Sequence, residues 1–113
     1  MTAQSFDHER HDVYRLSIDY VSRSFEASQV LEALHRHARN QWLRAAQTIP
    51  LNIAEGNGKR SLNDRAQFLD SARDSALECA AIQDVLVTTR GIMVQDDAAS
   101  DRGDSVSDGD EIR

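Results

Sequence analysis

An apolar seam along residues 68 to 86 constrains the fold more than any other feature of this sequence. Its members recur at alternating steps of four and three: Phe68, Ala72, Ser75, Cys79, Ile82 and Leu86. This spacing places them all on one face of an α-helix, and the alternation is typical of helices packed side by side in a bundle. Ser61-Leu62-Asn63-Asp64 resembles a capping box with Asp in place of Glu, so we expect this helix to begin there and to end near Arg90 and Gly91.

Two further stripes predict two more helices upstream. Between residues 12 and 25, apolar side chains follow steps of four and three at Tyr14, Ile18, Val21 and Phe25. The next helix is expected to start near residues 26–29, with Ser28 as a candidate N-cap. Its stripe consists of Leu34, Ala38, Trp42, Ala45, Ile49 and Ile53. The stripe passes through Pro50, which predicts a kink rather than an end of the helix.

The fold class follows from these stripes and from the small number of turn-forming residues. One proline and five glycines leave little material for the turns of a β-fold, so we predict an all-α, up-down antiparallel bundle with three clear helices. We expect a flexible N-terminus over residues 1–9, the bundle over residues 10–93, and a disordered acidic tail over residues 94–113. Gly56 is expected to adopt a left-handed conformation at the end of the second helix.

Charge is distributed unevenly along the chain. Of the net charge of −6, residues 96–113 carry −5, so the first 95 residues are close to neutral. An acidic total therefore does not exclude a nucleic-acid partner. Residues 35–65 are the most basic region, opposed only by Glu55 and Asp64. Its candidate phosphate-binding residues are Arg36, Arg39, Arg44, Lys59, Arg60 and Arg65.

Cysteine and histidine usage argues against a disulfide framework and a metal centre. Cys79 is the only cysteine and lies on the apolar seam, which predicts a buried, inert thiol in a reducing compartment. His35 and His37 are two residues apart and cannot share a helix face, while His8 and His11 have no fixed third ligand. With no signal-peptide pattern or long apolar run, we expect a soluble, cytoplasmic protein without a metal or cofactor.

The segment Ile49-Pro-Leu-Asn-Ile-Ala-Glu-Gly-Asn-Gly-Lys-Arg-Ser61 is the least ordinary stretch. Glu55 opposes the helix dipole in a last turn, and we expect a cation from another helix, Arg10, Arg15 or Arg65, to compensate it. Asn52 is interpreted as a buried residue that hydrogen-bonds a backbone group. The loop of residues 56–60 has two interpretations: an exposed turn with solvated cations, or a contact to a backbone phosphate. No nucleophile–base pair accompanies it.

This segment also carries a resemblance to a known family. Ile49, Pro50, Asn52, Ile53, Ala54, Glu55 and Gly56, with the helix patterns around them over roughly residues 10 to 90, resemble a bacterial four-helix-bundle family. That family includes the 23S ribosomal RNA intervening-sequence proteins and the accessory variability protein of diversity-generating retroelements. The resemblance implies an up-down bundle without catalytic activity, commonly a pentamer. It also implies nucleic acid, and a protein such as a reverse transcriptase, as partners. The family's fourth helix has no counterpart in the acidic tail.

The sequence thus supports two interpretations of function. The leading one is a non-enzymatic, oligomeric helical bundle that binds the backbone of RNA or DNA as an adaptor. The alternative is a purely structural or interaction bundle, or a truncated family copy, without nucleic-acid binding. A continuous basic face would favour the first interpretation, whereas arginines neutralised by neighbouring acids would favour the second.

Overall fold

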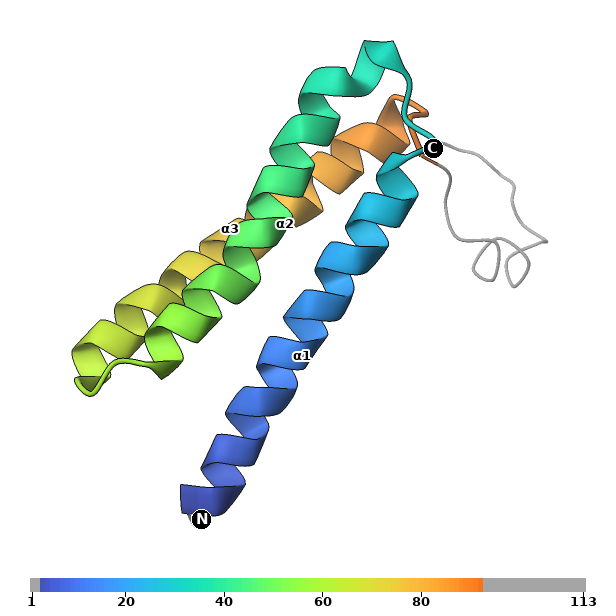
Figure 1. Cartoon of the computed structure of the whole chain (residues 1–113). Coiled ribbons are helices and arrows are strands. Elements are labelled where there is room, and N and C mark those ends of the chain that lie inside the picture. The colour runs from blue at the N-terminus through green and yellow to red at the C-terminus, as the bar shows by residue number, and fades with distance from the viewer. Residues whose placement is uncertain (1–2, 93–113) are drawn as a thin grey trace, which may run out of the picture.

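Three long helices joined by short connections make up the computed structural model, which describes residues 3–92. They are α1 (Ala3–Ser28), α2 (Arg36–Asn57) and α3 (Leu62–Thr88), with a 3₁₀ turn, η1 (Ala33–His35), before α2. Successive helices run up, down and up (Figure 1). No strand occurs among the described residues, so the predicted all-α, three-helix architecture is confirmed. No described helix is long and apolar enough to cross a membrane.

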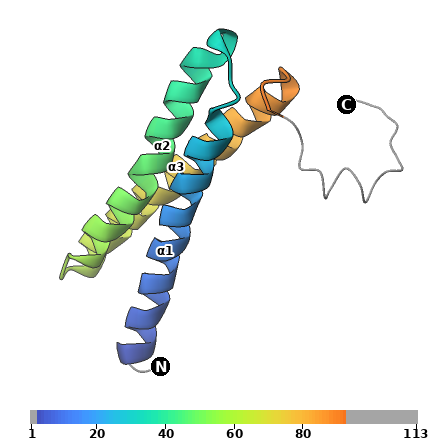
Figure 2. The same ribbon diagram turned by 45° about the vertical axis from the view of Figure 1, so that its right-hand side comes forward.

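The core is centred on the interface between α2 and α3, and α2 packs against both other helices (Figure 2). Trp42, which is 2% exposed, lies at its middle and is surrounded by small or aliphatic side chains. The predicted seam of α3 supplies Cys79, Ile82 and Leu86 to this cluster. Since α1 packs chiefly on α2 and hardly on α3, one flank of the molecule between α1 and α3 stays open.

The apolar stripe predicted for α1 is only partly buried. The buried residues of α1 are Ser17, Ser24 and Ser28. Of the predicted stripe, Val21 is half-buried against the core, as is the neighbouring Tyr20, while Ile18 and Phe25 are exposed. Each serine hydroxyl donates to a backbone carbonyl in the preceding turn, for example Ser24 Oγ to the Tyr20 carbonyl at 2.8 Å. Because the hydroxyls are satisfied within their own helix, they can be buried at little cost, and small side chains let the helices approach closely.

The junction of the first two helices differs from the sequence-based expectation. α1 begins at Ala3 and continues to Ser28, so Ser28 is the last residue of α1 and not an N-cap. Helix α2 begins only at Arg36. Leu34, predicted as the first core residue of the second stripe, lies in η1 and is 89% exposed. Leu31 takes its place in the core, because the chain must turn before α2 can pack.

The second helix passes through Pro50 without ending, as predicted, and continues to Asn57. The expected left-handed glycine at position 56 was wrong, since no described glycine has a positive φ. Gly56 is buried inside α2, where a Cβ would lie 3.1 Å from Phe68 Cβ on α3. The glycine is needed because the two backbones approach closely there, and helix α2 is capped two residues later by Gly58.

The ends of α3 follow recognisable capping patterns. Ser61 is the N-cap, as predicted, and its Oγ accepts a hydrogen bond from the Asp64 amide at 3.2 Å. At the other end Arg90, the one described non-glycine residue with positive φ, adopts 66°. The Gly91 amide donates to the Leu86 carbonyl and the Arg90 amide to the Val87 carbonyl, which is a Schellman motif. The predicted acidic tail lies outside the described residues.

Candidate nucleic-acid interface

The turn between α2 and α3 gathers three of the six candidate cations, but two of them hold the turn itself. Arg65 is half-buried, and its Nε donates to the Lys59 carbonyl at 2.7 Å. The Lys59 ammonium lies 3.8 Å from a Glu55 carboxylate oxygen and 5.3 Å from the centre of the Phe68 ring. Arg60 is exposed and forms no ion pair among the described residues. Arg60 is therefore the cation of this turn best able to meet a ligand.

The cation that compensates Glu55 comes from the turn itself. We had expected Arg10, Arg15 or Arg65 from another helix, and this expectation was wrong. Lys59, four residues along the chain, forms the ion pair. The reason is geometric, because α2 continues past Gly56 and brings Lys59 back to the face that carries Glu55. The pair is partly exposed and offsets the unfavourable position of a carboxylate at a helix C-terminus.

The other three candidates lie on α2. Arg36 and Arg44 are exposed on its outer face, about 12 Å apart along the axis and about 80° apart around it. Arg39 lies to one side and is half-buried. None of the three forms an ion pair among the described residues. No acid occurs between residues 33 and 54, so the outer face of α2 stays basic up to Glu55.

The six candidates thus form two groups and not one cluster. Arg36 and Arg39 belong to the first turns of α2, whereas Lys59, Arg60 and Arg65 surround its far end. The 22 residues of α2 span roughly 33 Å, and Arg44 lies between the groups. A small ligand cannot reach both groups, whereas a polyanion lying along α2 can.

The residues of the Ile49–Gly56 motif are mainly architectural. Pro50, Ile53 and Gly56 are buried, Ile49 is half-buried against the core, and Ala54 is exposed. Asn52 is half-buried and donates from Nδ2 to the Thr48 carbonyl of its own helix at 2.8 Å, so a backbone partner was correctly predicted. The Thr48 and Ser75 hydroxyls lie 2.6 Å apart and join α2 to α3.

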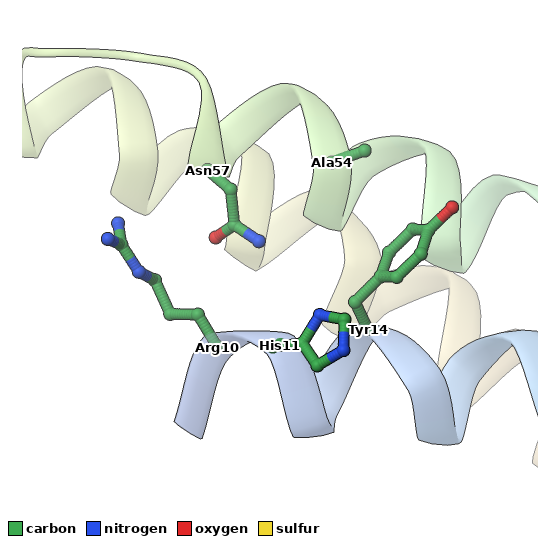
Figure 3. A pocket seen from close by; sticks show the side chains of 5 residues that line it. All are labelled: Arg10, His11, Tyr14, Ala54 and Asn57. Atoms are coloured by element: carbon green, nitrogen blue, oxygen red, sulfur yellow. The ribbon is translucent and has the colours of Figure 1, made fainter. Parts of the chain in front are cut away.

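Two surface features beside the basic residues were not predicted from the sequence. The first is a cavity of about 460 Å³ between α1 and the last turn of α2, lined by Arg10, His11, Tyr14, Ala54 and Asn57 (Figure 3). The second is an apolar groove of about 340 Å³ on the open flank, lined by Leu16, Ser17, Tyr20, Ile49, Ala76, Ala80 and Gln83. Each combines residues from different helices, so only the arrangement of the helices reveals it.

Residues 3–92 give little support for a metal site or for a reactive thiol. No group of three or more His, Cys, Asp or Glu side chains gathers there to hold a metal ion. Cys79 is 1% exposed, which confirms the predicted burial. Burial raises the pKa of its thiol above the ordinary value, so the reactive thiolate is disfavoured.

A known protein family matches most of this sequence. No curated protein matches this sequence. The model of the family described as 23S rRNA-intervening sequence protein matches residues 9–101, which include all three helical stripes and the Ile49–Gly56 motif. The matched region covers most of the chain. The chain therefore belongs to the 23S rRNA-intervening sequence protein family.

Proposed function

We propose that this protein is a non-enzymatic helical-bundle adaptor that binds the phosphate backbone of nucleic acid along the outer face of α2. The observation that carries the proposal is the acid-free stretch from residue 33 to residue 54, with Arg36 and Arg44 exposed and outside any ion pair of the described residues. Arg60 extends this surface beyond Glu55. A family named for an intervening sequence of 23S rRNA supports an RNA ligand, and the buried free thiol of Cys79 suits the reducing cytoplasm.

Backbone binding has a thermodynamic signature that the protein can be tested for. Each neutralised phosphate releases condensed counterions, so log K falls with log salt by roughly 0.9 per contact on a duplex and about 0.7 on a single strand. We expect the double variant Arg36→Gln/Arg44→Gln to flatten this slope by about 1.4 to 1.8 and to weaken binding similarly for all sequences. Fluorescence anisotropy with labelled RNA and DNA over a range of salt concentrations measures both quantities.

Arg73 on α3 offers a matched control. It is exposed like Arg36 and Arg44, but Asp70 and Asp74 flank it within one helical turn. Arg44→Gln alone should flatten the slope by about 0.7 to 0.9. Arg73→Gln removes the same charge and should leave the slope unchanged. Equal losses from Arg73→Gln and from Arg44→Gln would show that only total charge matters and would contradict the α2 surface. Absence of binding to any nucleic acid at low salt would overturn the proposed function.

A second candidate function, a self-associating interaction bundle, is favoured by the apolar groove. Leu16 is 67% exposed beside the groove, and Ala76 and Ala80 form its α3 wall. Residues 96–113 carry a net charge of −5 and no apolar periodicity, so they offer no matching stripe. We therefore propose that a second copy of this chain covers the groove in a homo-oligomer, for which the family resemblance implies five copies.

Two neighbouring alanines of α3 test this association. Ala80 lines the groove, whereas Ala81 is exposed outside it. We expect Ala80→Glu to shift the protein toward monomer, since it places a charge in an apolar contact, and Ala81→Glu to leave the mass unchanged. Light scattering coupled to size-exclusion chromatography measures the mass. A wild-type protein that is monomeric at high micromolar concentration would exclude this candidate.

A further inference from the structure

The cavity between α1 and the end of α2 is open to solvent and has the volume of a small-molecule site. Its volume of about 460 Å³ falls within the usual range for ligand pockets, roughly 300–1,000 Å³. Arg10, His11 and Tyr14 enter from α1, and Ala54 and Asn57 from α2. Figure 3 shows the Asn57 carboxamide pointing from α2 toward α1, the Tyr14 ring reaching from α1 toward α2, and the His11 ring close to α1.

The lining of this cavity contains hydrogen-bonding groups but no carboxylate. Two acids that neighbour lining residues in the sequence have partners outside the cavity. Asp12 lies 3.8 Å from His8 Nε2, and Glu55 lies 3.8 Å from Lys59 Nζ. The lining side chains are a guanidinium, an imidazole, a phenol, a methyl group and a carboxamide, and the imidazole and the phenol also present aromatic faces. Such walls suit a polar ligand with a flat aromatic face.

The end of α2 favours a neutral ring over an oxyanion on the α2 side of the cavity. Ala54 and Asn57 belong to the last turn of α2, where backbone carbonyls create a partial negative charge of roughly half an electron. That charge disfavours a phosphate beside Ala54 and Asn57 and favours a group that carries N–H donors there, whereas Arg10 lies on the α1 side. An adenine base meets these requirements, because its 6-amino group donates, its N7 accepts, and its ring stacks on aromatic side chains. Asn is the side chain that pairs with both adenine atoms at once.

We propose that this cavity receives an unstacked adenine base of single-stranded nucleic acid, with Asn57 reading its N6/N7 edge and Tyr14 and His11 providing the stacking surface. The inference rests on the proposed function, which places the nucleic-acid backbone on the adjacent α2 surface and Arg60. It deepens that function by assigning single strands as the preferred ligand and adenine as the preferred base. Backbone contacts on α2 supply affinity, and the cavity supplies base preference.

Free adenosine tests the cavity without any contribution from phosphate. Nuclear magnetic resonance titration of the ¹⁵N-labelled protein with adenosine should shift the amide signals of His11, Tyr14, Ala54 and Asn57. Inosine carries an oxygen in place of the 6-amino group and should bind roughly 5- to 150-fold more weakly. Asn57→Ala and Tyr14→Leu should each weaken adenosine binding, and Tyr14→Phe, which keeps the aromatic ring, should weaken it less than Tyr14→Leu does. Adenosine shifts that are absent, or that lie elsewhere on the protein, would overturn the proposal.

Oligonucleotides separate this inference from the proposed function. With oligo(A) and oligo(U) of equal length, Asn57→Ala should reduce the preference for oligo(A) and leave the salt slope unchanged. Arg36→Gln/Arg44→Gln should flatten the slope and leave the preference unchanged. Salt-dependent binding with no preference for oligo(A) would refute the base cavity and leave the backbone surface standing. Adenosine binding at the cavity without any binding of oligonucleotides would refute the proposed function.

Discussion

The Trp42 indole Nε1 donates a hydrogen bond of 3.0 Å to the Tyr20 phenol oxygen, which joins α2 to α1. The Tyr20 hydroxyl in turn donates to Gln83 Oε1 on α3. A single phenol thus connects all three helices at the level of the core. Because α1 and α3 hardly touch elsewhere, this relay is the main polar link between them in the described residues.

Removal of the Tyr20 hydroxyl should therefore destabilise the bundle. Tyr20→Phe leaves the indole N–H of a side chain that is 2% exposed without its partner, which costs about 1–3 kcal/mol of unfolding free energy. Urea unfolding followed by the fluorescence of Trp42, the one tryptophan of the chain, measures the loss.

Tyr14→Phe serves as the control for this prediction. The Tyr14 hydroxyl forms no hydrogen bond among the described residues, so its loss should change the unfolding free energy by less than about 0.5 kcal/mol. Equal effects of the two substitutions would mean that the relay contributes nothing to stability.

Stability should fall at alkaline pH because a buried thiol, Cys79, and a half-buried phenol, Tyr20, link the core to protonation. Burial raises the pKa of Cys79 above its ordinary value of 9.0. Burial also raises the pKa of Tyr20 above its ordinary 10.0, an effect that the hydrogen bond from Trp42 partly offsets. The unfolded chain then releases these protons at a lower pH than the folded protein does. The contribution is complete below about pH 9 and is lost as pH rises through the folded pKa values.

A variant without the thiol isolates part of this pH dependence. We expect Cys79→Ala to be less stable at neutral pH because it opens a cavity, yet to lose less stability between pH 9 and 10 than the wild type. Unfolding free energies from urea titrations at a series of pH values provide the comparison. A stability curve with the same alkaline slope in both proteins would contradict the linkage to Cys79.

The seam of α3 could be predicted from sequence because its core consists of apolar side chains at regular steps. The face of α1 could not, because its buried positions are Ser17, Ser24 and Ser28, which resemble surface residues until their hydrogen bonds to preceding carbonyls are known. Apolar residues of α1 such as Leu16 line the open groove and are not part of the core.

The candidate site was predictable in composition but not in arrangement. The basic character of residues 35–65 is a property of the sequence, whereas the use of Arg65 and Lys59 within the turn depends on the position of α3. The cavity between α1 and the end of α2 has no local signature, since Tyr14 and Asn57 are 43 positions apart and both line it only because α1 packs along α2.

Gly56, in the last turn of α2, and Gly58, which caps this helix, should respond in opposite ways to alanine. Gly56→Ala places a Cβ 3.1 Å from Phe68 Cβ, which belongs to a side chain close to the backbone and cannot move freely. We expect a loss of about 1–3 kcal/mol, typical of overpacking, despite the better helix propensity of alanine.

Gly58→Ala is the matched control two residues later. Its Cβ would meet nothing closer than the Glu55 carbonyl at 3.6 Å, and φ of −85° suits any residue. We expect this variant to be neutral or up to about 1 kcal/mol more stable, since alanine restricts the unfolded chain. Thermal melts of both variants decide the question, and destabilisation by Gly58→Ala alone would contradict the close approach at Gly56.

Replacement of Arg90 by glycine should stabilise the protein, because this arginine adopts a backbone conformation that favours glycine. Its φ of 66° costs an L-residue roughly 1–2 kcal/mol, while the Schellman hydrogen bonds it permits need only its backbone. Arg90→Gly should raise the unfolding free energy by about 0.5–1 kcal/mol. The gain is reduced by the greater freedom of glycine in the unfolded chain.

Arg90→Ala removes the same charge near the C-terminus of α3 but keeps the Cβ, so it should be no more stable than the wild type. Thermal unfolding of the three proteins in parallel measures the difference, and equal stability of Arg90→Gly and Arg90→Ala would show that the left-handed backbone carries no cost.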